Sequence, residues 1–76
     1  MNEEKLFSIG EIAKLTGLTV RTLQYYDNIG LVPLDKEKTN GRRFYREKDL
    51  VRLQQVLFYK SLGLEINEIK NLLNEE

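Results

Sequence analysis

The stretch from Thr19 to Val32 reads Thr-Val-Arg-Thr-Leu-Gln-Tyr-Tyr-Asp-Asn-Ile-Gly-Leu-Val, and its spacing predicts a short helix with two faces. The apolar face holds Val20, Leu23, Tyr26 and Ile29. The polar face holds Arg21, Gln24, Tyr25 and Asn28. Cationic, amide and phenol groups on one face suit phosphates and base edges. The pattern therefore predicts a helix that is presented to a nucleic acid.

A second helix is predicted just before this one. Ser8 and Glu11 have the spacing of a capping box, and apolar residues at helical spacing follow. Gly17 is suited to a left-handed cap at the end of this helix, and Thr19 is a favourable N-cap for the next. Only three residues, 16–18, separate the two helices, so the pair has the form of a helix-turn-helix.

A β-hairpin is predicted after the second helix. Gly30 ends that helix, and Pro33 prevents its continuation. Asn40-Gly41 is a strong hairpin signal within residues 34–45, and the second strand is predicted at 42–45. In that strand Phe44 should point to one face, with Arg43 and Tyr45 on the other.

Two more helices are predicted, over residues 47–62 and 67–73. The complete order predicts one mostly α domain, a winged helix-turn-helix with a two-stranded wing and two further helices. We expect residues 1–76 to form this single DNA-binding domain, ordered from about residue 6 to residue 74. The aromatic residues Phe58 and Tyr59 belong either to the core or to a surface that meets further segments or a partner subunit.

Composition narrows the possible functions. The chain has no Cys and no His, which removes thiolate metal sites, the commonest metal ligand and the commonest general base. The carboxylates fall on solvated helix faces, so we expect no enzyme activity, no catalytic residues, no cofactor and no metal. No apolar run is long enough to span a membrane, so we expect a cytoplasmic protein without membrane association.

The net charge of zero conceals a segregated distribution. Between Lys36 and Arg52 there are seven basic and three acidic residues, whereas both ends of the chain are acidic. A basic centre permits nucleic-acid binding. A solvated surface of mixed charge explains the same distribution equally well, so charge alone does not decide between them.

The motifs together resemble the N-terminal DNA-binding domain of the MerR family of bacterial transcription regulators. The resemblance runs through the segments 9–13, 16–23, 25–27 and 29–31 to Asn40-Gly41, Arg43, Tyr45, 49–50 and 62–63. It covers nearly the whole chain in the correct order and spacing. Residues 53–60, Leu-Gln-Gln-Val-Leu-Phe-Tyr-Lys, are more similar to the TipA-like, multidrug-responsive branch than to the metal-sensing branch.

The resemblance implies a mechanism. Such regulators bind as homodimers to promoters whose spacer is too long for polymerase, then bend and untwist the DNA to realign the promoter elements. RNA polymerase is thus an indirect partner, and the protein is associated with the bacterial nucleoid. Dimerisation uses a C-terminal coiled-coil helix and the signal enters through an effector domain, and we expect both to lie beyond this chain. We therefore expect the 76-residue chain to be mostly monomeric.

The resemblance also assigns candidate roles in DNA binding. Thr19 caps the recognition helix and offers a backbone amide to a phosphate, Arg21 reaches base edges or a phosphate, and Tyr25 reaches the sugar-phosphate backbone. On the wing, Arg43 pairs with a phosphate, whereas Tyr45 is balanced between packing and a phosphate contact. The remaining candidates are Gln24, Arg42 and Lys60.

Three positions depart from the family pattern. Gln24 replaces a common Arg, and Gln favours adenine edges, so the operator preference should differ. Arg42 replaces a usual Tyr and adds a cation, although charges beside a hairpin often serve only to discourage edge pairing. Arg46 replaces a usual Ser cap, which loses about 1 kcal/mol of capping but adds another cation near the wing.

An alternative function remains open. An excisionase-like architectural or protein-interaction module with the same winged fold would also suit a chain of 76 residues. Continuation of the reading frame into an amphipathic helix would support the regulator, and a natural stop codon would support the module.

Overall fold

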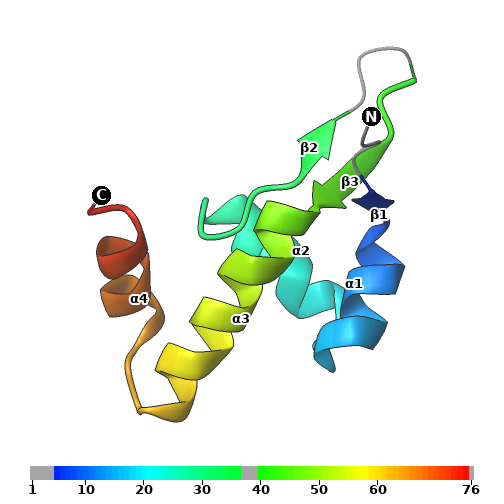
Figure 1. Cartoon of the computed structure of the whole chain (residues 1–76). Helices are drawn as coiled ribbons and strands as arrows, with labels where there is room; N and C mark the ends of the chain where they lie inside the picture. Colours follow the sequence, from blue (N-terminus) through cyan, green and yellow to red (C-terminus); the bar gives the residue numbers. More distant parts are fainter. Residues whose placement is uncertain (1–4, 37–39, 76) are drawn as a thin grey trace.

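The computed structural model describes residues 5–36 and 40–75 (Figure 1). The elements in chain order are β1 (Leu6–Phe7), α1 (Ile9–Thr16), α2 (Val20–Asn28), β2 (Asp35–Lys36), β3 (Arg43–Arg46), α3 (Glu47–Ser61) and α4 (Ile66–Leu73). The helices α3 and α4 begin and end within one residue of their predicted bounds. The helices α1 and α2 form the predicted helix-turn-helix. The predicted mostly α winged fold is therefore confirmed.

The helix-turn-helix is shaped by local signals that the sequence already carries. The Ser8 amide donates to Glu11 Oε1 at 2.8 Å, and the Glu11 amide donates to Ser8 Oγ at 3.1 Å, so the capping box of α1 is formed. Gly17 adopts a φ of 77°, which a residue with a side chain rarely takes. This left-handed cap turns the chain sharply enough for α1 to pack against α2.

Among the described residues the sheet has three strands, whereas the sequence predicted two. Its order is β1-β3-β2, and both pairings are antiparallel, with Phe7 opposite Tyr45 and Asp35 opposite Phe44. β1 is only two residues long, too short to show alternation in the sequence. Gly41 takes a φ of 69°, whereas Asn40 contributes through its side chain, which accepts from the Arg42 amide at 2.9 Å.

Several predicted features lie outside the described residues. They include the wing tip at residues 37–39, with the charges Glu37 and Lys38, the N-terminal acids Glu3 and Glu4, and the terminal Glu76.

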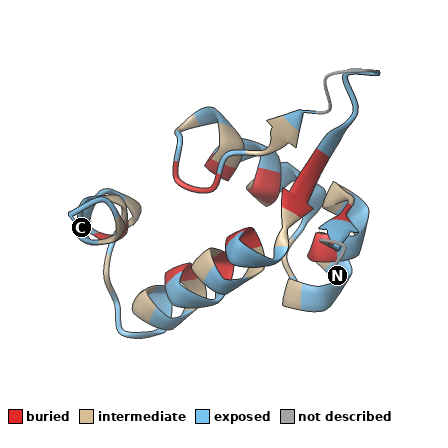
Figure 2. Ribbon diagram, turned by 45° about the horizontal axis from the view of Figure 1, so that its top comes forward, coloured by how far each residue is buried: buried red, intermediate tan, exposed pale blue. Residues whose placement is uncertain are grey.

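The core fills the space between the helices and the inner face of the sheet (Figure 2). Figure 1 shows α3 running diagonally from the end of the sheet, with α1 on one side and α4 on the other. The largest fully buried side chains come from α1, α2, the loop after α2, β3, α3 and α4: Ile12, Leu23, Tyr26, Leu31, Val32, Tyr45, Leu53, Val56 and Ile69. Phe58 is exposed and Tyr59 is partly buried against the core, which separates the two aromatic residues left undecided above.

The start of α3 keeps half of a capping box despite the loss of Ser. Arg46 occupies the N-cap position, and its side chain cannot accept a hydrogen bond. The Arg46 amide nevertheless donates to Asp49 Oδ2 at 2.8 Å. The buried Asp49 therefore supplies its own half of the capping box, and the half that a Ser side chain would supply is lost.

Candidate nucleic-acid interface

The two faces of α2 separate as the spacing predicted, except that Val20, which was expected on the apolar face, is 38% exposed at the start of the helix. Leu23 and Tyr26 are buried, whereas Arg21, Gln24 and Tyr25 are exposed, Tyr25 to 52%. The Tyr25 and Tyr26 rings contact each other at a tilt, with centroids 6.1 Å apart. Adjacent tyrosines thus have opposite placements, because successive helix positions point about 100° apart.

The N-terminal end of α2 is suited to an anion. Thr19 caps it, accepting from the Thr22 amide at 3.0 Å. The first turn, residues 20–23, contains no acidic residue. Free backbone amides and the positive end of the helix dipole therefore face outward without a carboxylate to oppose a phosphate.

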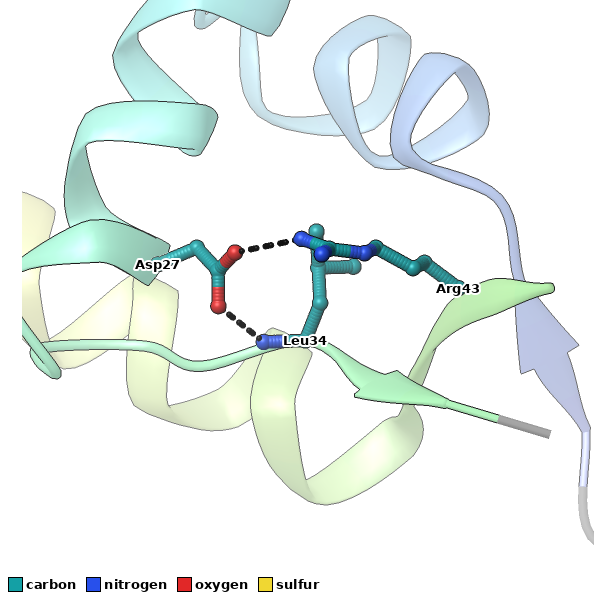
Figure 3. Close-up of polar contacts among 3 residues, drawn as sticks. All are labelled: Asp27, Leu34 and Arg43. Atoms are coloured by element: carbon teal, nitrogen blue, oxygen red, sulfur yellow. Dashed lines mark hydrogen bonds and ion pairs between the residues drawn. The ribbon is translucent and has the colours of Figure 1, made fainter. Parts of the chain in front are cut away.

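The wing is joined to α2 through Asp27 (Figure 3). Asp27 Oδ2 contacts Arg43 Nη1 at 3.1 Å, and Asp27 Oδ1 accepts from the Leu34 amide at 2.9 Å. One carboxylate in the last turn of α2 thus holds both the loop before β2 and a side chain of β3. The Arg43 side chain remains 62% exposed, so it still has donors free to meet a phosphate.

Arg46 joins the two strands of the wing rather than standing free beside them. Its Nε donates to Asp35 Oδ2 at 2.8 Å, and its guanidinium lies over the Phe44 ring at 5.1 Å. Phe44 and Arg46 share one face of β3 because alternate strand residues point the same way. This contact explains why Phe44 is buried without belonging to the main core.

Tyr45 is the candidate that the structure contradicts as a phosphate contact. Its side chain is fully buried on the core face of β3, so packing is its role. Among the described residues its hydroxyl has no hydrogen-bond partner. Burial raises the pKa of the Tyr45 hydroxyl to about 12, and the charges of Asp27 and Asp49 add to the shift.

Arg42 and Lys60 are both exposed. Arg42 precedes β3 at the base of the wing tip, close to Arg43 in the chain. Lys60 lies in the last turn of α3, roughly 20 Å along the helix from the wing at a rise of about 1.5 Å per residue. The structure therefore places Lys60 well apart from the wing cations.

Asp27 is the residue of this candidate site that sequence reasoning missed. It appeared only as part of the Tyr-Tyr-Asp motif, with no role assigned to it. Its partner Arg43 is 16 residues away, so no short-range spacing connects them. Only the antiparallel return of the chain brings the wing back to α2.

The described residues hold no cluster of three or more metal-binding side chains of the His, Cys, Asp or Glu type. Over the same residues, every helix is too short or too polar to cross a bilayer.

Comparison with known proteins places this geometry in a family. The family model described as MerR HTH family regulatory protein matches residues 7–76. The chain is 45% identical over 69 residues to the HTH-type transcriptional activator TipA of Streptomyces coelicolor, covering 91% of this chain and 27% of TipA. It is 40% identical over 68 residues to the activator mta of Bacillus subtilis, covering 90% of this chain and 26% of mta. The chain thus spans about a quarter of the length of these relatives.

Solved structures agree with the sequence comparison. The crystal structure of the regulator SkgA from Caulobacter crescentus matches with a TM-score of 0.89 at 36% identity, over 96% of this chain and 52% of SkgA. The structure of HiNmlR, a MerR family regulator lacking the sensor domain and bound to promoter DNA, matches with a TM-score of 0.77 at 28% identity, over 90% of this chain and 52% of HiNmlR. A winged helix-turn-helix with this motif order, matched over nearly its full length, is a DNA-binding domain of transcription regulators, and the chain belongs to the MerR HTH family.

Proposed function

We propose that this domain binds duplex DNA at promoters, with α2 in the major groove and the wing against the flanking backbone. The observation that carries the proposal is the exposed face of α2, where Arg21, Gln24 and Tyr25 point outward beside an N-terminus free of acids. Docking a second helix in the groove is the usual geometry of a helix-turn-helix. The relative HiNmlR, whose structure was solved bound to promoter DNA, supports DNA binding by a domain of this fold.

Within this proposal the side chains divide by task. Arg21 and Gln24 specify sequence by reaching base edges, with Gln24 favouring adenine. Thr19, Tyr25, Arg42, Arg43 and Lys60 position the domain on phosphates and sugars, which carry no sequence information. Tyr45 is excluded from both groups because it is buried.

The proposed mode of regulation is distortion of an overlong promoter spacer by a homodimer, which aligns the promoter for RNA polymerase. The family resemblance supports this step, together with the activators TipA and mta among the relatives. Deforming a DNA site costs on the order of 1–10 kcal/mol, so the wing contacts must help to offset that cost. Energy transfer between dyes at the two duplex ends, measured with a dimeric form of the protein, would detect the bend, and unchanged transfer on saturation would contradict it.

Arg21 provides the direct test of sequence recognition. We expect Arg21→Ala to weaken binding to a duplex selected from a random library by about 1–3 kcal/mol in fluorescence anisotropy, because a base contact is lost. Lys48→Ala is the matched control, since it removes an exposed cation from α3 outside the proposed face. Equal losses for the two variants would show that α2 is not the recognition helix.

A further inference from the structure

Two cations from other helices contact the C-cap of α2 and the loop that follows it. Lys70 Nζ, from α4, donates to the Ile29 carbonyl at 2.6 Å. Arg52 Nε, from α3, donates to the Leu31 carbonyl at 2.6 Å. The last turn of α2 contains no basic residue of its own. Because the C-terminal end of a helix carries partial negative charge, Lys70 at the C-cap carbonyl supplies a cation that α2 lacks, and Arg52 holds the loop two residues further on.

Arg52 also contacts the end of α4. Its Nη2 donates to Asn74 Oδ1 at 2.9 Å, and Asn74 is the C-cap residue of α4. One guanidinium thus connects the loop after α2 with the end of α4. The planar fork of arginine fixes the direction of both hydrogen bonds, which a lysine ammonium cannot do.

The carbonyls that receive these bonds are held in place. Gly30 takes a φ of 75°, which reverses the chain after α2. The Leu31 amide then donates to the Tyr26 carbonyl at 2.9 Å, and the Leu31 and Val32 side chains are fully buried. Because this turn is anchored in the core, a shift of Arg52 or Lys70 acts on α2 itself.

We propose that Arg52 and Lys70 are positioning residues for DNA recognition, which set the direction of α2 from α3 and α4. This inference rests on the proposed function of α2. A nine-residue helix is about 13 Å long, so a rotation of about 5° at its C-terminal end moves the first turn by about 1 Å. A looseness of about 1 Å is enough to impair a binding site. The position of α4 is thereby coupled to the side chains that meet the bases.

The experiment uses three variants that keep the net charge. Arg52→Lys removes the fork, and Asn74→Ala removes only the contact with α4. Asn71→Ala is the matched control, because Asn71 is an exposed asparagine of α4 that makes no side-chain hydrogen bond among the described residues. Each variant is measured without DNA by amide chemical shifts, and with DNA by its affinity for the selected duplex and for a scrambled one.

We expect Arg52→Lys to weaken binding to the selected duplex by about two- to thirtyfold, the range of couplings carried between distant residues. Affinity for the scrambled duplex should stay unchanged because the charge is kept. Amide shifts in the first turn of α2, residues 20–23, should move in Arg52→Lys and less in Asn74→Ala, and should match wild type in Asn71→Ala. If Arg52→Lys does not fold, as judged by circular dichroism, Asn74→Ala carries the test.

First-turn shifts that move no further in Arg52→Lys and Asn74→Ala than in Asn71→Ala would overturn the inference, even if affinity falls. A wild-type chain that selects no duplex would instead overturn the proposed function. The chemical shifts would then still decide whether the link positions α2.

Discussion

The helix α2 and the wing differ in whether their exposed polar side chains form ion pairs within the protein. On α2 the exposed residues Arg21, Gln24 and Tyr25 extend from the protein, and the helix is held by its opposite face. On the wing Arg43 and Arg46 are already paired with Asp27 and Asp35. The helix can therefore devote its outer face to DNA, whereas the wing cations must also hold the wing together.

The reason for this difference is the amount of apolar surface available. A nine-residue helix buries Leu23 and Tyr26 and needs little more to be held. The wing strand β2 has only two residues, and a two-stranded hairpin alone is marginal in water. Ion pairs, a third strand and the buried Tyr45 supply the support that the short strands lack.

The largest expected effect separates a buried tyrosine of the wing from an exposed one of the helix. Tyr45→Ala should lower the free energy of unfolding by about 3–5 kcal/mol, since it leaves a cavity in the core. Tyr25→Ala should change it by no more than about 0.5 kcal/mol, because the side chain is exposed. Urea denaturation measures both. Similar losses of unfolding free energy for the two variants would contradict the assignment of Tyr45 to the core and Tyr25 to the surface.

A smaller effect depends on pH and on the same hydroxyl. The pKa of Tyr45 is raised in the folded state from 10.0 to about 12, so the unfolded chain loses this proton first as pH rises. The stabilisation is complete well below pH 10 and is lost as pH rises through 12, by roughly 3 kcal/mol.

Tyr45→Phe is the control for that pH dependence, because it keeps the ring and removes the titrating group. Denaturation curves at pH 9 to 12 should show a shallower decline for Tyr45→Phe than for wild type. Below pH 10 the variant should be as stable as wild type or more so by about 1 kcal/mol, since the hydroxyl it removes is buried without a partner. Parallel declines would mean that Tyr45 does not titrate in this range.

The smallest effects distinguish the two exposed cations at the base of the wing. Arg43→Ala should weaken binding to the selected and the scrambled duplex equally. It should also reduce the slope of log affinity against log salt concentration by about one unit. It should also cost about 0–1 kcal/mol of stability through the lost pair with Asp27.

Arg42→Ala is the comparison for Arg43→Ala, because Arg42 is equally exposed but is not the partner of Asp27. It should reduce the salt slope without a change in the urea midpoint. If neither variant changes the salt slope, the wing cations do not contact phosphates.

Much of the helical framework could be predicted because its signals are local. The box between Ser8 and Glu11, the cap at Thr19 and the glycine at position 17 each act within four residues. The same holds for the phase that buries Tyr26 and exposes Tyr25. The strand β1 and the burial of Phe44 and Tyr45 could not be predicted from local signals. They depend on pairing between strands that are distant in the chain, and on the Arg46 guanidinium that covers Phe44.

The sequence by itself determined the helices, the two faces of α2 and the family to which the chain belongs, because these depend on periodicity, caps and motif order. Tertiary structure alone decided which polar groups remain available. Asp27 meets Arg43 across 16 residues, Arg52 meets Leu31 across 21, and Lys70 meets Ile29 across 41. Such contacts form only when the chain returns on itself, and no local spacing encodes them.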